Sequence, residues 1–143
     1  MSAQSGSWTF STIPQGWTVL DTGALRCVDQ SGFSHNVIAT EDDLSESTTL
    51  AQYIELQSVI IRRYLQNAEI EFHDSPAPNS MEECMLVSIR FQADDGRPAA
   101  QRQIYVRKNR RVGILTLTTL ESDLSKLEPP FAAIFVNARF SPA

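Results

Sequence analysis

The spacing of the hydrophobic residues changes once along this chain, and that change constrains the fold more than any other feature. Between Leu50 and Leu65 the apolar residues recur three or four positions apart, which is the period of an α-helix. After Asn67 the period falls to two, and Ile70 and Phe72 alternate with polar residues as they would in a β-strand. We therefore expect a helix over residues 49–66 that leads directly into a sheet.

The expected helix should pack an apolar stripe against that sheet. Its hydrophobic residues are Leu50, Tyr53, Ile54, Leu56, Ile60, Ile61, Tyr64 and Leu65, most of which fall on one side of a helix. Ser47 or Thr48 could cap its first turn, because a hydroxyl oxygen accepts a hydrogen bond from an N–H group that has no partner within the helix.

Short strands are expected on both sides of this helix. The segments 8–12, 24–28 and 36–40 precede it, and the segments 85–91, 101–107 and 112–119 follow it. Turns are expected at 29–32, at Asp95-Gly96 and at 109–110, and a loop over 75–80. Residues 112–119 are rich in β-branched side chains, which favours the central strand of the sheet.

The C-terminal region is expected to hold a second helix. Pro129-Pro130 should end a short preceding segment, and a helix over 131–140 would turn Phe131, Ile134, Phe135 and Ala138 inward. The order of elements indicates an α+β fold, in which helices flank an antiparallel sheet. The length of 143 residues favours a single domain over 1–143. Residues 1–7 are small and polar, which predicts that this end of the chain is disordered.

Charge and cysteine content argue against several classes of protein. The formal net charge of −5 disfavours a nucleic-acid partner, and the only basic cluster, at 107–111, straddles a turn. Cys27 and Cys84 lack the close spacing of zinc ligands, so we expect no metal, and we expect no cofactor. Both cysteines fall inside apolar, strand-like runs, so we expect them to be reduced core residues, with a disulfide as the alternative. The sequence shows neither a signal-peptide pattern nor an apolar run that could span a bilayer, so we expect a cytoplasmic protein without direct membrane insertion.

No catalytic motif is evident. The sequence has neither a nucleophile elbow nor a phosphate-binding loop, and His35 and His73 are expected to be ordinary surface residues. We therefore expect a binding protein and not an enzyme. The least ordinary polar residues are Gln57, within the apolar helix, and Gln103, which shares a strand face with Gln101. Gln57 and Gln103 could line a cavity and bind a peptide backbone or small polar side chains, or they could be exposed to solvent.

Ordered features along nearly the whole chain resemble the DcrB/Eag family (DUF1795), whose members share the PsbP-like α/β/α fold. These features are Phe10, Pro14 and Trp17, the strand 36–38, Leu50, Ala51, Tyr53 and Gln57, the strand pair 102–105 and 115–119, and the dipeptides Asp123-Leu124 and Glu128-Pro129. The resemblance therefore implies a PsbP-like α/β/α sandwich.

The resemblance also implies a function. Eag members are chaperones of the bacterial type VI secretion system, typically dimeric, which shield the N-terminal transmembrane helices of an effector in the cytoplasm. By this resemblance the client-binding residues would be Leu25, Val37, Ile38, Gln57 and Gln103. The alternative is a non-catalytic interaction module of the same fold with an unrelated partner.

Overall fold

The computed structural model describes residues 3–20, 24–28, 34–74 and 83–142. Its strands are β1 (Ala3–Ser5), β2 (Trp8–Phe10), β3 (Thr18–Val19), β4 (Leu25–Val28), β5 (Ser34–Asp43), β6 (Gln66–Asp74), β7 (Glu83–Gln92), β8 (Pro98–Lys108), β9 (Arg111–Leu120) and β10 (Ala138–Phe140). Its helices are α1 (Leu50–Tyr64), the 3₁₀ turn η2 (Glu121–Asp123) and α2 (Leu124–Val136). The turn expected at 29–32 and the loop expected over 75–80 lie outside the described residues.

The described strands form a seven-stranded sheet in the order β3-β4-β5-β9-β8-β7-β6, and neighbouring strands pair antiparallel. The strand rich in β-branched residues, β9, is the middle strand, as expected. The hairpins around Gly96 and Asn109 are also confirmed, since both residues have a positive φ that suits a tight turn. The α+β class expected from the sequence is therefore confirmed.

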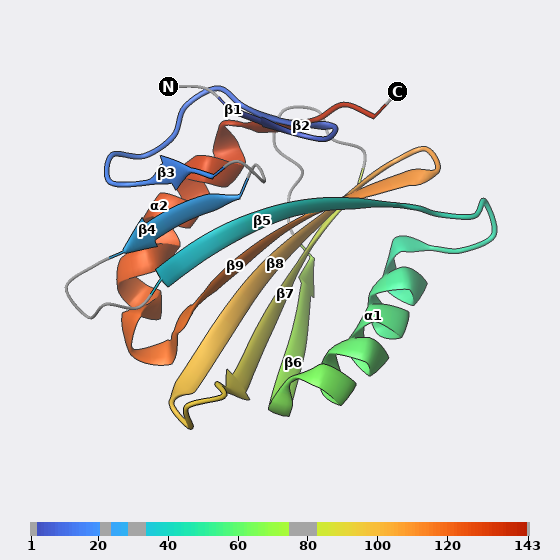
Figure 1. The fold of residues 1–143 in the computed structure, drawn as a ribbon. Helices are drawn as coiled ribbons and strands as arrows, with labels where there is room; N and C mark the ends of the chain where they lie inside the picture. Colours follow the sequence, from blue (N-terminus) through green and yellow to red (C-terminus); the bar gives the residue numbers. More distant parts are fainter. Residues whose placement is uncertain (1–2, 21–23, 29–33, 75–82, 143) are drawn as a thin grey trace.

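One helix packs on each face of this sheet (Figure 1). Successive strand residues point to opposite faces, so β8 turns Ile104 toward α2 and Tyr105 toward α1. The α2 side holds the larger core, which includes Leu115, Leu117, Phe131 and Ile134. The α1 side holds a second core, which includes Val87, Ile89, Leu50 and Ile54. The layers are therefore helix, sheet and helix.

A second, three-stranded sheet extends the larger core. Its order is β1-β2-β10, and it buries Trp8, Phe10 and Phe140. It also brings the first and the last described strands, β1 and β10, to one side of the molecule (Figure 1). This sheet corrects two expectations: Ala3–Ser5 is a paired strand and not part of a disordered tail, and Ala138–Phe140 is a strand and not the end of a helix.

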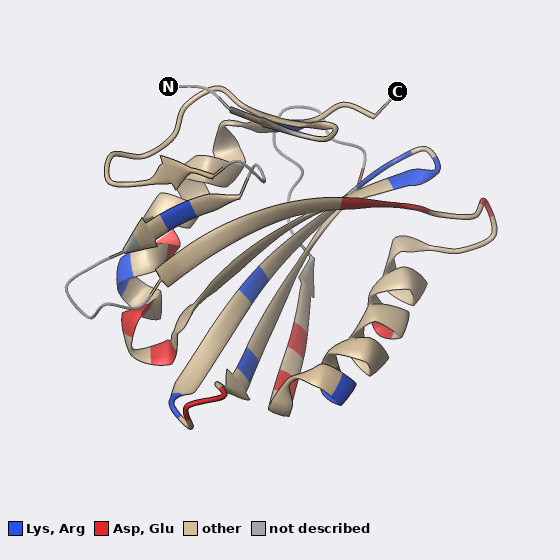
Figure 2. Cartoon of the chain, in the orientation of Figure 1, with Lys and Arg blue, Asp and Glu red and all other residues tan. Residues whose placement is uncertain are grey.

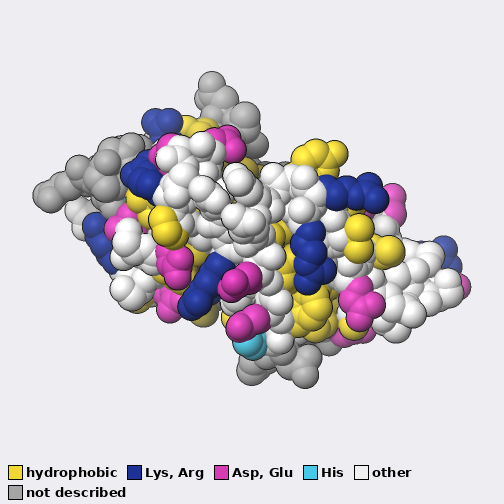
Figure 3. All heavy atoms as spheres, turned by 90° about the horizontal axis from the view of Figure 1, so that it is seen from below, with side chains coloured by type: hydrophobic (Ala, Val, Ile, Leu, Met, Phe, Trp, Pro, Cys, Tyr) yellow, Lys and Arg dark blue, Asp and Glu magenta, His cyan; other side chains and the backbone are white. Residues whose placement is uncertain are grey.

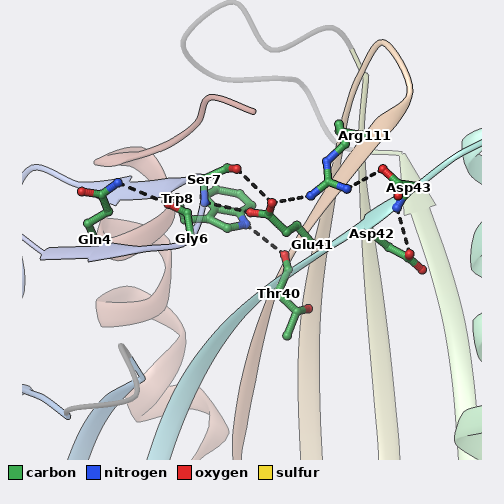
Figure 4. Close-up of polar contacts among 9 residues, drawn as sticks. All are labelled: Gln4, Gly6, Ser7, Trp8, Thr40, Glu41, Asp42, Asp43 and Arg111. Carbon is green, nitrogen blue, oxygen red and sulfur yellow. Dashed lines mark hydrogen bonds and ion pairs between the residues drawn. The ribbon is translucent and has the colours of Figure 1, made fainter. Parts of the chain in front are cut away.

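A carboxylate at the end of β5 fastens the small sheet to the large one (Figure 4). Glu41 accepts hydrogen bonds from the backbone N–H of Ser7 at 2.8 Å, from the Ser7 hydroxyl at 2.9 Å and from Arg111, which also binds Asp43. Nearby, Trp8 Nε1 donates to the carbonyl of Thr40 at 3.2 Å. The Ser7 N–H above all, then the Ser7 hydroxyl and Arg111, hold the pKa of Glu41 below its ordinary value, although partial burial opposes this.

Helix α1 differs from expectation in its cap and in its exposed side. Thr49, and not Ser47 or Thr48, is the N-cap, and it forms a capping box with Gln52. Ser58 is buried with its hydroxyl donating to the Ile54 carbonyl at 2.9 Å. Of the residues assigned to the apolar stripe, Leu56, Ile60 and Tyr64 are 62%, 45% and 80% exposed. Part of the predicted stripe therefore faces away from the core.

Helix α2 begins before the two prolines, which were expected to end a separate segment ahead of it. Pro129 and Pro130 lie inside Leu124–Val136. Proline lacks an N–H group and weakens a helix interior, but here Leu127 and Phe131 on either side of the pair are buried against the sheet. The inward positions predicted for Phe131, Ile134, Phe135 and Ala138 are confirmed.

Candidate functional site

Part of the sheet on the α1 side is not covered by any of the described helices or strands, and two rows of side chains cross it. In one row Ile38, Thr116 and Gln103 lie opposite one another on β5, β9 and β8. In the next row Asn36, Thr118 and Gln101 do the same. We call the patch that these six residues form the open face; within it Ile38 is 44% exposed and Gln103 only 9%. None of the six is charged, and Figure 2 shows that the charges of β5 gather at its far end.

One flank of α1 borders the open face. Tyr53, Gln57, Ile60 and Tyr64 are spaced three or four residues apart, so they lie along one side of the helix. At one end of this side Tyr53 Oη donates to Asp42 of β5 at 2.9 Å. At the other end Tyr64 lines a hollow of about 450 Å³ together with Thr118 of β9. The flank therefore faces β5 and β9.

The open face combines apolar edges with a polar floor. Ile38 is 44% exposed on β5, and Ile60 and Tyr64 are exposed on α1. The floor is ordered by its own hydrogen bonds: Gln101 Nε2 donates to Thr118 Oγ1 at 3.2 Å, and Tyr105 Oη donates to Gln103 Oε1 at 2.7 Å. Burial raises the pKa of Tyr105, so its hydroxyl stays protonated and remains a donor.

Hydrogen bonding fixes the direction in which the Gln103 amide points. Its oxygen is occupied by Tyr105, and within the described residues its Nε2 has no partner. Asn36 Oδ1 likewise lacks a partner among the described residues. A buried polar group without a hydrogen bond costs about 1–3 kcal/mol of free energy. Such a group therefore favours a ligand that offers it a hydrogen-bond partner. The open face can therefore bind apolar surface and a few polar groups at once.

The five client-binding residues predicted from the sequence do not all meet at this surface. Ile38 and Gln103 belong to the open face, and Gln57 is half-buried on the bordering flank of α1. Leu25 and Val37 lie opposite each other on β4 and β5 and are 0% and 1% exposed in the core beneath α2. Adjacent strand residues point to opposite faces, so Val37 and Ile38 cannot line one surface. Leu25 and Val37 are therefore core residues in this structure.

Several residues of the open face were not singled out from the sequence. Thr116 and Thr118 were taken only as members of a β-branched strand, and Asn36 as part of a short one. On the bordering flank of α1, Ile60 and Tyr64 carried a usable signal, because their spacing of four places them on one edge of the stripe. The underside of the molecule shows hydrophobic side chains gathered in the half that holds α1, next to basic ones (Figure 3).

The two histidines differ in their surroundings. His35 is 0% exposed, contrary to the expected surface position, and its Nδ1 lies 2.7 Å from Thr119 Oγ1. Its Nε2 lies 3.9 Å from Asp123, at the beginning of α2. His73 is exposed on β6, 3.6 Å from Glu71. Thr119 is also fully buried, so this group of side chains links β5, β9 and the start of α2 inside the molecule.

The architecture is that of the PsbP-like fold. PA94 from Pseudomonas aeruginosa, a protein of unknown function and putative regulator, aligns with a TM-score of 0.71 and 20% identity over 92% of this chain and 90% of its own. LpqN, involved in cell envelope biogenesis of Mycobacterium tuberculosis, aligns with a TM-score of 0.70 and 14% identity over 96% and 86%. PsbP (CyanoP) of Synechocystis sp. PCC 6803 aligns with a TM-score of 0.56 and 11% identity over 94% and 86%.

Identities of this size show a shared fold and do not transfer an activity. No protein-family model matches the chain, and no curated protein does. Among the described helices, none is both long enough and apolar enough to cross a bilayer.

Proposed function

We propose that the open face binds an apolar helical segment of another protein. The carrying observation is the set of large hydrophobic side chains exposed around an uncharged floor: Ile38 on β5, and Ile60 and Tyr64 on α1. Single exposed apolar residues are ordinary, but a gathered patch is typical of an interaction surface. Burying it against an apolar helix contributes about 25 cal/mol per Å² before the costs of association.

The partner we propose is a transmembrane helix held outside the membrane. Such helices pack through small residues and inter-helical hydrogen bonds, and Gln103, Thr116 and Gln101 offer amide and hydroxyl groups of the kind those contacts use. Together with the DcrB/Eag resemblance, this supports a cytoplasmic chaperone that shields the N-terminal transmembrane helices of a type VI secretion effector. In this proposal the protein acts by binding and not by catalysis.

We also propose that the chaperone is a homodimer. A two-fold pair would present two open faces to one client and enclose a helix from both sides. Light scattering should then give twice the chain mass of 16.0 kDa at micromolar concentration. A mass of one chain under those conditions, with and without client, would contradict a dimer.

Co-purification with a client tests the proposed function. A peptide with effector-type transmembrane helices is co-expressed with the wild-type protein, with Ile38→Asp and with Val136→Asp. Ile38 and Val136 are comparably exposed, at 44% and 58%, but Val136 lies on α2 across the sheet. Ile38→Asp should lose the client and Val136→Asp should retain it. If the folded Ile38→Asp protein retains full binding, the open face is not the client site.

Co-purification of a partner protein that has no transmembrane segments would favour the alternative function, that of a general interaction module. The protein would then be an interaction module with the same open face and a different class of partner.

A further inference from the structure

A second hollow lies on the other side of the sheet, between α2 and β7. Its floor is formed by Leu86 and Ile104, which lie opposite each other on β7 and β8. Its wall on α2 is formed by Phe131, Ala132 and Phe135, and its volume is about 290 Å³. The size is near the lower end of small-molecule pockets, and such pockets are lined mainly by aliphatic and aromatic side chains.

One positive charge stands at the rim of this apolar hollow. Arg102 lies two residues before Ile104 on β8, so both side chains are on the same face of the sheet. The Arg102 side chain is only 17% exposed. It donates to Glu128 of α2 at 3.2 Å, and within the described residues its guanidinium has no other hydrogen bond or ion pair. A guanidinium can bind a carboxylate through two parallel N–H donors, so Arg102 has donors left for an anion.

Glu128 is the more exposed member of this ion pair. Its side chain is 51% exposed, so water screens its attraction to Arg102 and it can turn into solvent at low cost. Beyond Arg102 the surface becomes charged: Arg102 also lines a neighbouring hollow of about 170 Å³ with Ser88, Arg90 and His73 and with the two carboxylates Glu69 and Glu71. An apolar compartment thus meets a charged one at Arg102.

We propose that this α2–β7 hollow binds a small amphipathic carboxylate. The apolar chain lies on Leu86, Ile104 and Phe135, and the carboxylate replaces Glu128 as the partner of Arg102. We propose an anion because Arg102 stands at the rim, where its guanidinium would attract a carboxylate and repel a cationic head group. This site lies across the sheet from the open face and is independent of the function proposed above.

Titration of the wild-type protein with octanoate tests the proposal. Amide resonances are followed by NMR, with octylammonium and octanol as probes of the same chain length. Octanoate should shift the amides of residues 86, 104 and 131–135, and bind at least about fivefold more tightly than either control. Equal affinity for the three probes, or shifts elsewhere, would overturn the assignment to Arg102. No octanoate binding at millimolar concentration would overturn the site itself.

Variants sharpen the test. Arg102→Gln should weaken octanoate binding about fivefold or more, whereas Glu128→Gln should strengthen it about twofold, because it removes the competing carboxylate. Ala132→Phe extends a ring from the α2 wall into the hollow and should abolish binding. Ile38→Asp should leave octanoate binding unchanged, so failure here is separable from failure of the client proposal. Equal binding by Glu128→Gln and Arg102→Gln would mean that the pair has no part in the site.

Discussion

The hydroxyl of Tyr105 donates a 2.7 Å hydrogen bond to Oε1 of Gln103, two residues earlier on the same face of β8. Tyr105 is 1% exposed and belongs to the core beneath α1, whereas Gln103 is at the edge of the open face. The bond therefore connects the core to the surface that we propose binds the client. It also leaves the NH₂ group as the part of the Gln103 amide that has no partner among the described residues.

Removal of this hydroxyl should destabilise the protein. Tyr105→Phe leaves a nearly buried amide oxygen without its donor, and should lower the free energy of unfolding by about 1–2 kcal/mol. Tyr53→Phe is the matched control, because its hydroxyl binds the exposed Asp42 and water can replace it. Urea unfolding followed by circular dichroism measures both. A smaller loss for Tyr105→Phe than for Tyr53→Phe would contradict this account.

The ring of Phe140 lies so close to the backbone of β9 at Gly113 that it leaves no room for a side chain there. A Cβ atom at position 113 would lie 2.6 Å from Cδ1 of that ring, closer than carbon atoms can approach. Gly113→Ala should therefore destabilise the protein by roughly 1–3 kcal/mol, the usual cost of overpacking a core. The double variant Gly113→Ala with Phe140→Leu should recover part of the loss, which a double-mutant cycle would detect. Strict additivity of the two changes would argue against direct contact.

Glu41 should make stability depend on pH. Its folded-state pKa is lowered, so its contribution is present above the unfolded-state pKa and is lost as the pH falls through the folded-state pKa. Glu41→Gln should cost roughly 1–2 kcal/mol at pH 7, and the difference from wild type should shrink below about pH 4. Unfolding curves at pH 7, 5 and 3 test this. A difference that is constant with pH would mean that the charge of Glu41 is not the cause.

Elements that depend on local pattern were predictable, as β9, the hairpins and α1 illustrate. Their signals are a run of β-branched residues, an Asp-Gly turn and a helical period. The short strand β10 was not predictable, because its partner β2 lies far away in sequence and pairing leaves no local pattern over three residues. The continuation of α2 through Pro129 was missed for a related reason, since burial of Leu127 and Phe131 outweighs the local preference.

The candidate site was predictable only in part. The polar positions Gln57 and Gln103 stood out against apolar neighbours, and both lie at or beside the open face. Leu25 and Val37 do not lie at the open face. The sequence alone could not show this, because assigning a strand residue to one face requires knowing on which side each helix packs. Leu56 and Ile60 on α1 were assigned to the core for the same reason, although they are exposed.

Site-specific photo-crosslinking tests the central claim most directly. A benzoylphenylalanine placed at Ile60 on the flank of α1, or at Val136 on α2, reports which surface touches a bound transmembrane segment. The account predicts a crosslink to the client from position 60 and none from position 136. Crosslinking from position 136 and not from position 60, in folded proteins that bind the client, would place the client on the opposite side of the sheet and contradict the proposal.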